Sequence, residues 1–479
     1  MKPGGYQRLT QMAKLLDKEN APFEKVDAES AGKLAEEAVK DPHHVKAMKP
    51  LPSRKMKKEV PLMDCFVAPC KEGCPIHQDI TTYLQLVGEE KYEEAMEVIT
   101  EKNPLPFITG TICAHNCMSK CTRNFYETPV HIREMKLKAA ENGYEALLEK
   151  LPVPAVTKAG KAAVIGGGPA GMAAAYFLRK GGMEVTLFEA KESLGGVVRH
   201  VIPPFRISED AIEKDAEILR KMQVDIHCNT KLESLEELKK QGYTKIVLAV
   251  GAPVQGSLKL ESGMPKNALE FLAEFKQTDG KVSLGKHVVV IGGGNTAMDT
   301  ARAAKRNAGV EHVYLIYRRT RRYMPADEEE LVMALEDGVE FKELLSPVKL
   351  ENGQLFCKVM QLSDYDVSGR RGVTETGETV WVPADTVIAA VGEKVPTDWY
   401  QANGLAVSEK GRLYVDEKTL KTSDDNVYAA GDGLYGPATV VEAIRDGRKV
   451  LRQLQEKCWR VILIKLAEEE KGLCLREGY

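Results

Sequence analysis

The sequence has no long apolar run and no excess of charge of either sign. Its apolar stretches, such as Val288–Ile291 and Val461–Ile464, fall far short of the roughly 18 residues that a membrane-spanning helix needs. The N-terminal residues also lack a continuous apolar segment of signal-peptide length. The chain is therefore expected to be cytoplasmic, with no contact to a membrane.

The charges nearly cancel, because 67 Lys and Arg face 70 Asp and Glu in 479 residues, for a net charge of −3. A dedicated polyanion binder normally carries a basic excess, so nucleic acid is not an expected partner. Hydrophobic residues make up 43% of the chain, an ordinary fraction for globular proteins. At roughly 150 residues per domain, the length predicts about three domains.

Paired C-x2-C motifs are also absent, although six of the ten cysteines crowd into one short region. They form the patterns C-x4-C-x3-C-P and C-x3-C-x3-C. A reducing cytosol favours metal or cluster ligation over disulfides, and the missing C-x2-C pairs favour iron–sulfur over zinc. Six buried thiols without a ligand are the other reading. The predicted ligands are Cys65, Cys70, Cys74, Cys113, Cys117 and Cys121.

Helical spacing of apolar residues over 80–87 and 92–99 predicts two helices between these cysteine triplets, with Gly88 as the break. His115 lies inside the second triplet. It is either a ligand, a hydrogen-bond partner of the cluster or, as we favour, a structural residue.

A first dinucleotide-binding motif begins with the apolar strand Lys161–Ile165 and turns through G-x-G-x-x-G into an Ala-rich helix. Glycines allow the backbone to approach a pyrophosphate, whose charge the helix N-terminus attracts. An acidic residue ends the next strand, 23 residues after the first glycine, and can accept hydrogen bonds from a ribose. The predicted contacts are Gly166, Gly168, Pro169, Ala170, Gly171 and Glu189.

A second motif of the same kind follows 126 residues later, after the strand His287–Ile291. Its next strand ends in two arginines instead of an acid. Arginine suits a 2′-phosphate, so this loop is expected to prefer NADPH. Arg318–Arg322 also fits a nucleic-acid or localisation patch. The predicted contacts are Gly292, Gly294, Asn295, Thr296, Ala297, Arg318 and Arg319.

Two dinucleotide loops in one chain imply a flavin, FAD, together with a nicotinamide. Leu194–Val197 follows the first acidic residue at a distance suited to lining a flavin, and Val427–Asp432 is a strand ending in Gly-Asp. The helix that starts after Gly436 would direct its positive end toward the flavin. Two strand-to-glycine junctions bracket the second loop. These signals add Gly195, Gly196, Val197, Gly251, Gly392, Gly431, Asp432, Ala438 and Thr439.

The predicted fold is therefore α/β: an N-terminal α-helical iron–sulfur domain followed by two Rossmann-like domains, with an NADPH domain inserted into the FAD domain. The predicted boundaries are an arm or linker over 1–60, the iron–sulfur domain over 61–150, the FAD domain over 158–283 and 393–455, the NADPH domain over 284–392, and a tail over 456–479.

Several motifs carry a family resemblance from about residue 60 to 455. The cysteine patterns, both glycine loops, Asn103–Cys113, Ile202–Arg206 and Tyr317–Arg319 resemble the small subunit of glutamate synthase and the N-terminal half of dihydropyrimidine dehydrogenase. Most similar is the C-terminal half of the selenate reductase family, in which Lys2–Leu9 looks like a segment that follows a flavin-binding barrel. The resemblance implies that Arg206 contacts a cofactor and that a separate polypeptide supplies the barrel.

The resemblance also implies two 4Fe-4S clusters, one held by Cys65, Cys70 and Cys121 and the other by Cys74, Cys113 and Cys117. The sequence departs from the family at two positions. Relatives have a further Cys where this chain has Leu62, and Glu or Gln where it has Lys136. The fourth ligands therefore stay open, with Glu134 and Asp64 as candidates.

The expected function is an NADPH-dependent FAD and iron–sulfur oxidoreductase subunit in a hetero-oligomer. Electrons would pass from NADPH through FAD and the clusters to a partner flavoprotein reductase that acts on a purine-like heterocycle or a selenate-type substrate. The alternative is the small (beta) subunit of NADPH-dependent glutamate synthase, which needs an amidotransferase partner. Because the protein mainly positions its cofactors, no catalytic acid or base is assigned. An assembly subunit with decayed sites is disfavoured because both glycine loops are intact.

Overall fold

The computed structural model describes residues 67–451 except Tyr126, 366–370 and Lys410, together with the single positions Lys33 and Glu36. The predicted ligand Cys65, the candidate Asp64, the tail over 456–479 and almost all of the predicted arm over 1–60 lie outside the described residues. Among the helices of the described ranges, none combines the length and the apolar character that crossing a membrane requires.

The chain divides into two compact units, which are described one at a time. The larger unit spans Phe66–Gly256, Leu272–Asp279 and Val391–Tyr479. The smaller unit holds Ser257–Phe271 and Gly280–Ala390 of the described residues. Helix α14 (Ala268–Gln277) is divided between the two.

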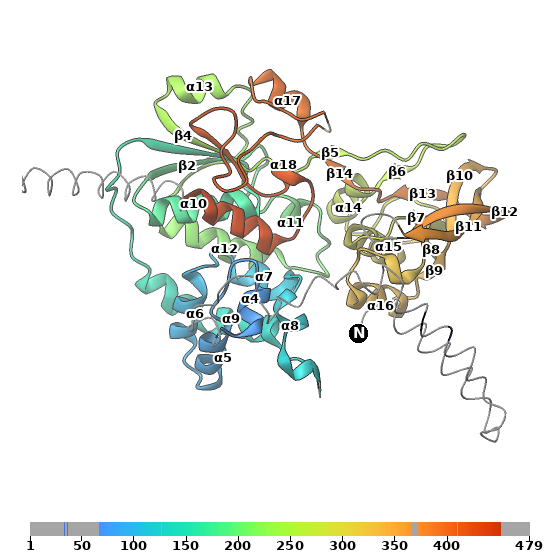
Figure 1. Ribbon diagram of the computed structural model, residues 1–479, viewed down its shortest axis with the longest axis horizontal. Coiled ribbons are helices and arrows are strands. Elements are labelled where there is room, and N and C mark those ends of the chain that lie inside the picture. Colours follow the sequence, from blue (N-terminus) through green and yellow to red (C-terminus); the bar gives the residue numbers. More distant parts are fainter. Residues whose placement is uncertain are drawn as a thin grey trace, which may run out of the picture. The chain divides into compact units, whose positions relative to one another are not determined.

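The larger unit begins with a helical region (Figure 1). This region contains Cys70, Cys74, Cys113, Cys117 and Cys121. The predicted helices between the triplets are present, and both bury an apolar face. Tyr83 fixes the first of them by donating its hydroxyl to the carbonyl of Ile132 at 3.2 Å. The helices are α4 (Pro69–Gly73), α5 (Ile80–Gly88), α6 (Tyr92–Thr100), α7 (Pro106–Ile112), α8 (Asn116–Ser119), the 3-10 helix η3 (Thr122–Phe125) and α9 (Ile132–Lys150).

A five-stranded parallel sheet forms the second part of the larger unit, in the order β15-β4-β1-β2-β3. The central strands are almost wholly apolar, as expected for strands covered on both faces. The strands are β1 (Lys161–Ile165), β2 (Glu184–Phe188), β3 (Asp225–His227), β4 (Tyr243–Leu248) and β15 (Val427–Ala429).

Helices and a short ribbon complete this part of the unit. The antiparallel ribbon pairs β5 (Val254–Gln255) with β14 (Glu393–Lys394). The helices are α10 (Pro169–Lys180), α11 (Val197–His200), α12 (Glu209–Lys221), α13 (Leu235–Lys240), α17 (Thr397–Ala402) and α18 (Asp432–Tyr435), and residues 440–451 are also helical.

Buried polar contacts join the helical region to the sheet part. Asp215 of α12 is fully buried, and its carboxylate accepts the backbone N–H groups of Phe107 at 3.1 Å and Ile108 at 2.8 Å. These N–H groups belong to the first turn of α7, where they lack partners within the helix. Tyr176 of α10 donates to the carbonyl of Thr100 at 3.1 Å. The two parts of the larger unit therefore share one core, and the carboxylate of Asp215 fixes the helix that leads to Cys113.

The smaller unit contains a second five-stranded parallel sheet, ordered β6-β13-β7-β8-β9, and an antiparallel sheet, β10-β11-β12 (Figure 1). Its elements are β6 (Lys266–Asn267), β7 (His287–Ile291), α15 (Asn295–Arg306), β8 (His312–Tyr317), η4 (Arg321–Tyr323), α16 (Glu328–Glu336), β9 (Glu340–Glu343), β10 (Leu345–Glu351), β11 (Gln354–Tyr365), β12 (Arg371–Pro383) and β13 (Thr386–Ala389).

Candidate functional site

The first glycine loop connects β1 to α10, with Pro169 in the first turn of the helix. Gly166 has φ of +105°, and a Cβ there would lie 2.8 Å from the carbonyl carbon of Ala249. A Cβ on Gly171 would collide with the backbone of Gly166. Glycine at these two positions therefore permits the tight turn and the close packing of helix on strand that a dinucleotide-binding loop has.

Glu189 lies against this loop at the end of β2 and is buried. Its Oε2 accepts the N–H of Gly167 at 2.6 Å, and its Oε1 accepts the N–H of Lys191 at 2.8 Å. Because an ionised carboxylate has about four acceptor positions, two remain for hydroxyl groups of a ribose. The geometry fits the role predicted for this acid.

The other predicted flavin contacts come from three segments. The N–H of Gly195 donates to the carbonyl of Gly167 at 2.8 Å, so this segment packs directly on the glycine loop. A Cβ on Gly431 would lie 2.6 Å from the Cβ of Ala170, which places the Gly-Asp segment against α10. Gly168 and Pro169 belong to the glycine loop, and the backbone of Gly196 closely approaches Gly168. The side chain of Val197 is exposed, and that of Arg206, which follows α11 in the chain, is half-buried.

Asp432 begins α18, and its Oδ1 accepts the N–H of Ala438 at 3.1 Å. Burial raises its pKa to about 6, and the nearby carboxylates of Glu393, Asp446 and Glu442 add to the shift. Thr439 donates its N–H to Glu442 at 3.1 Å. This segment therefore presents a carboxyl group that changes charge near neutral pH.

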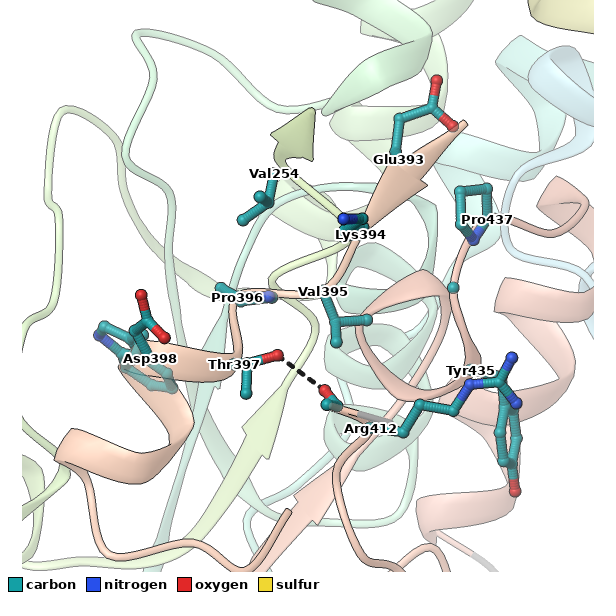
Figure 2. A pocket seen from close by; sticks show the side chains of 13 residues that line it. Val254, Glu393, Lys394, Val395, Pro396, Thr397, Asp398, Arg412, Tyr435 and Pro437 are labelled. Carbon is teal, nitrogen blue, oxygen red and sulfur yellow. Dashed lines mark hydrogen bonds between the residues drawn. The ribbon is translucent and has the colours of Figure 1, made fainter. Parts of the chain in front are cut away.

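A cavity of about 690 Å³ lies in the larger unit beside the ribbon of β5 and β14 (Figure 2). Figure 2 shows Val254, Val395 and Tyr435 around it, and the hydroxyl of Thr397 donates to the carbonyl of Gly411 at 2.7 Å. Burial raises the pKa of Glu393 in its wall. The sequence analysis did not select Glu393 as a site residue, because nothing but its position after Gly392 marks it. Gly251 and Gly392, which precede the two strands of the ribbon, both have positive φ.

The second glycine loop connects β7 to α15 in the smaller unit. A Cβ on Gly293 would lie 2.6 Å from Cδ2 of the Tyr317 ring, so the loop backbone runs directly over this ring. Ala297 occupies the position of the third glycine and is buried against Gly292. Asn295 exchanges hydrogen bonds with Asp327, at 3.0 Å and 3.3 Å. Gly294 and Thr296 form the start of α15, which fits a second pyrophosphate site.

The two arginines after β8 differ in their surroundings. Arg319 is half-buried, and its Nε donates to the carbonyl of Arg371 in β12 at 2.8 Å. Arg318 is exposed beside the end of the strand. Arg318 is therefore the more accessible of the two side chains, whereas Arg319 also contacts the antiparallel sheet.

Five of the predicted cluster ligands lie in the described residues. Cys74, Cys113 and Cys117 are buried and line one cavity, while Cys70 interacts electrostatically with both Cys121 and Cys74. Burial raises the pKa of Cys117 to about 12 and that of Cys74 above its usual value. Burial therefore disfavours the thiolate form of Cys74 and Cys117, and a bound cation such as cluster iron would favour it. The three thiols that share this cavity are one of the two ligand sets that the family resemblance implies.

Among residues 67–451, as far as they are described, no three His, Cys, Asp or Glu side chains converge on one point as ligands of a single metal ion would. The irons of a cluster are bound by different thiolates, so cluster ligands surround a cavity instead. The cavity of the buried trio also has His115 and Lys136 in its wall. The candidate Glu134 is not in that wall and pairs with Arg133 at 3.4 Å.

Comparisons with known protein families bear directly on both parts. Residues 160–447 match the family of pyridine nucleotide-disulphide oxidoreductases. Residues 51–146 match domain II of dihydropyrimidine dehydrogenase, described as a 4Fe-4S cluster domain. The chain belongs to the pyridine nucleotide-disulphide oxidoreductase family. It combines the FAD- and NADPH-binding fold of these NAD(P)H-dependent oxidoreductases with a 4Fe-4S domain.

Individual relatives agree with this membership. The chain is 40% identical to the oxidoreductase YgfK of Escherichia coli over 94% of its own length and 44% of that protein. It is 33% identical to the glutamate synthase [NADPH] small chain of Azospirillum brasilense, over 80% of the chain and 85% of the relative. The chain spans less than two thirds of the first relatives that it matches.

Solved structures show the same fold. Mycobacterium tuberculosis FprA in complex with NADPH has a TM-score of 0.52 and 20% identity, over 64% of this chain and 86% of that protein. The resemblance to the small subunit of glutamate synthase and to dihydropyrimidine dehydrogenase, expected from the motifs, is confirmed by these matches.

Proposed function

We propose that this chain is the electron-input subunit of an NADPH-dependent reductase. The observation that carries the proposal is the presence of two glycine loops, each between a parallel strand and a helix, with a carboxylate at one and arginines at the other. A flavin site and a nicotinamide site in one chain serve hydride transfer.

The residues of the chain would position both cofactors. The loop of Gly166–Gly171 would bind the FAD pyrophosphate, and Glu189 would accept hydrogen bonds from its ribose. Asp432 would contact the ribityl chain, and the backbone near Ala438 would face the flavin ring. In the smaller unit, Arg318 would neutralise the 2′-phosphate of NADPH. Bound FAD supplies the conversion of a hydride into single electrons.

The cysteines of the helical region would hold two 4Fe-4S clusters, which would supply one-electron transfer when bound. Cys74, Cys113 and Cys117 would hold one cluster, and Cys70 and Cys121 would contribute to the other together with Cys65. The match to a 4Fe-4S domain supports cluster binding, and the cavity that Cys74, Cys113 and Cys117 share supports their assignment to one cluster.

The electron acceptor in this proposal is a separate flavoprotein reductase subunit. Several relatives are named as subunits, among them the beta subunit of NADPH-Fe(3+) oxidoreductase of Geobacter sulfurreducens and the subunit PreT of an NAD-dependent dihydropyrimidine dehydrogenase of Escherichia coli. PreT is 30% identical over 80% of the chain and 90% of its own length, which favours a nitrogen heterocycle as the substrate. Within that class we propose a purine-like heterocycle. A selenate-type oxyanion is the other candidate, from the motifs shared with the selenate reductase family.

A small (beta) subunit of glutamate synthase is the alternative function. It is favoured by the extent of the match to the small chains of Azospirillum brasilense and Escherichia coli, which the chain covers to 85% and 88%. Leu62 and Lys136 argue against it, because they depart from the cluster motif of that group.

Anaerobic purification from the native host, with mass spectrometry of the co-purifying chains and assays of iron and flavin, tests the proposal. We expect a flavin-barrel subunit to co-purify and NADPH to bleach the bound flavin. An amidotransferase-sized partner would instead establish the alternative. A chain that binds FAD but is not reduced by NADPH would refute the electron-input role.

A further inference from the structure

A cavity lined by the segment 74–78 and by residues of α5, α8 and α9 brings a side-chain amide together with three buried thiols. The thiols belong to Cys74, Cys113 and Cys117, each at most 9% exposed. Gln78 lies in the same cavity wall and is 2% exposed. A cluster of the 4Fe-4S type needs four ligands, and these cysteines supply three.

The orientation of the Gln78 amide follows from its hydrogen bonds. Its Nε2 donates to the carbonyl of Val98 at 3.0 Å, and its backbone N–H donates to the sulfur of Cys74. The Val98 carbonyl can only accept, so the amide nitrogen faces it and Oε1 occupies the other position of the amide plane. Gln78 therefore lies directly beside the first thiol of the trio.

The Oε1 atom of Gln78 is buried and has no hydrogen-bond partner among the described residues. An unsatisfied buried acceptor of this kind costs about 1–3 kcal/mol. Such an oxygen is explained if it has a partner in the assembled protein, and an amide oxygen is able to coordinate a metal ion.

Two charged side chains near the trio are less suited to be the ligand. Lys136 donates its Nζ to the carbonyl of Thr109 at 3.3 Å, and an ammonium group has no lone pair for iron. Glu134 Oε2 is also buried without a hydrogen-bond partner, but Glu134 does not line this cavity, its side chain is 43% exposed, and its Oε1 pairs with Arg133. His115 is the remaining alternative in the cavity wall, and the experiment below includes it.

We propose that Gln78 Oε1 is the fourth ligand of the cluster held by Cys74, Cys113 and Cys117. The inference rests on the proposed function, which assigns a cluster to this trio. An amide ligand is neutral, so this cluster carries one negative charge less than a cluster with four thiolates. Its reduction potential is therefore higher than with a fourth thiolate, because potentials of such clusters follow their net charge.

The test uses the full chain, purified anaerobically and reconstituted with iron and sulfide, in the variants Gln78→Leu, Gln78→Cys, His115→Leu and Lys136→Met. Iron content and electron paramagnetic resonance spectra of the oxidised and reduced proteins are compared. Gln78→Leu removes the oxygen at similar volume, and we expect this cluster to lose one iron and to show the signal of an oxidised 3Fe-4S cluster.

Gln78→Cys is expected to keep all irons and to shift the midpoint potential of one cluster to a more negative value. His115→Leu and Lys136→Met are the matched controls from the same cavity, and both are expected to keep the iron content of the unchanged protein. If Gln78→Leu fails to assemble any cluster, the midpoint potential of Gln78→Cys still tests the proposal, and an unchanged potential in that variant would contradict it.

Full iron content and an unchanged spectrum in Gln78→Leu would overturn the proposal, as would a 3Fe-4S signal in His115→Leu alone. The reduction of FAD by NADPH is recorded on the same samples, and it does not depend on this ligand. An unchanged protein that reduces its flavin but assembles no cluster at the trio would overturn the inference while leaving the flavin and nicotinamide sites intact.

Discussion

The substitution Gly171→Ala tests whether the first glycine loop has the shape that a bound dinucleotide requires. The new Cβ would collide with the carbonyl oxygen of Gly166 and would lie 3.0 Å from its carbonyl carbon. It would also lie 3.3 Å from the Cβ of Ala249, so the loop has no free direction in which to relax. Overpacking of this kind costs typically about 1–3 kcal/mol.

If the loop moves away to relieve the collision, this free energy is lost from FAD binding. At about 1.4 kcal/mol per tenfold, the dissociation constant for FAD rises roughly 5- to 150-fold. The second loop contains Ala297 at the corresponding position, so a Cβ there is compatible with its backbone. The loss is therefore specific to the first loop.

Flavin content after gel filtration, together with titration of the apoprotein by FAD fluorescence, measures this change. Gly88→Ala is the matched control, because no atom lies within 4 Å of the position where its Cβ would be. Wild-type FAD affinity in a folded Gly171→Ala protein would refute the reasoning about the loop.

Three further predictions concern other side chains. Arg318→Ala should raise the KM for NADPH roughly 10- to 150-fold, because a hydrogen bond to a charged group contributes about 1.5–3 kcal/mol. The KM for NADH should stay unchanged. Equal effects on the two KM values would exclude a contact between Arg318 and the 2′-phosphate. Asp432 has a folded pKa of about 6 against an ordinary value of 3.8, so its contribution to stability is present below pH 3.8 and is lost as the pH rises through 6. Urea unfolding of Asp432→Asn should lack this pH dependence, and a slope matching wild type would contradict it. Asp215→Ala should lower the free energy of unfolding by about 2 kcal/mol or more, because two buried N–H groups lose their acceptor. Asp215→Asn should lower this free energy by less. The midpoints of urea unfolding of the two variants and the unchanged protein test this order.

The sequence was sufficient for the elements whose signals are local. Strand, glycine turn and helix follow one another within about 20 residues at both loops, and the structure has them where the pattern predicts. Glu189 was also predictable, because its distance from Gly166 is set by one helix and one strand. Domain boundaries and individual cofactor contacts stay predictions.

Contacts between distant segments could not be predicted in this way. Arg319 reaches the carbonyl of Arg371, 52 residues later, so the sequence alone could not separate its role from that of Arg318. The amide of Gln78, which lies in the loop before α5, is oriented by the carbonyl of Val98 in α6. No pattern in the sequence encodes either pairing, because each depends on how complete elements pack.

Anaerobic addition of NADPH to the purified full chain, followed by absorbance and by electron paramagnetic resonance, tests the central claim most directly. The account predicts that bound flavin bleaches and that signals of reduced iron–sulfur clusters appear, with NADH much less effective at equal concentration. Flavin and iron that are bound but stay oxidised in the presence of NADPH would contradict it.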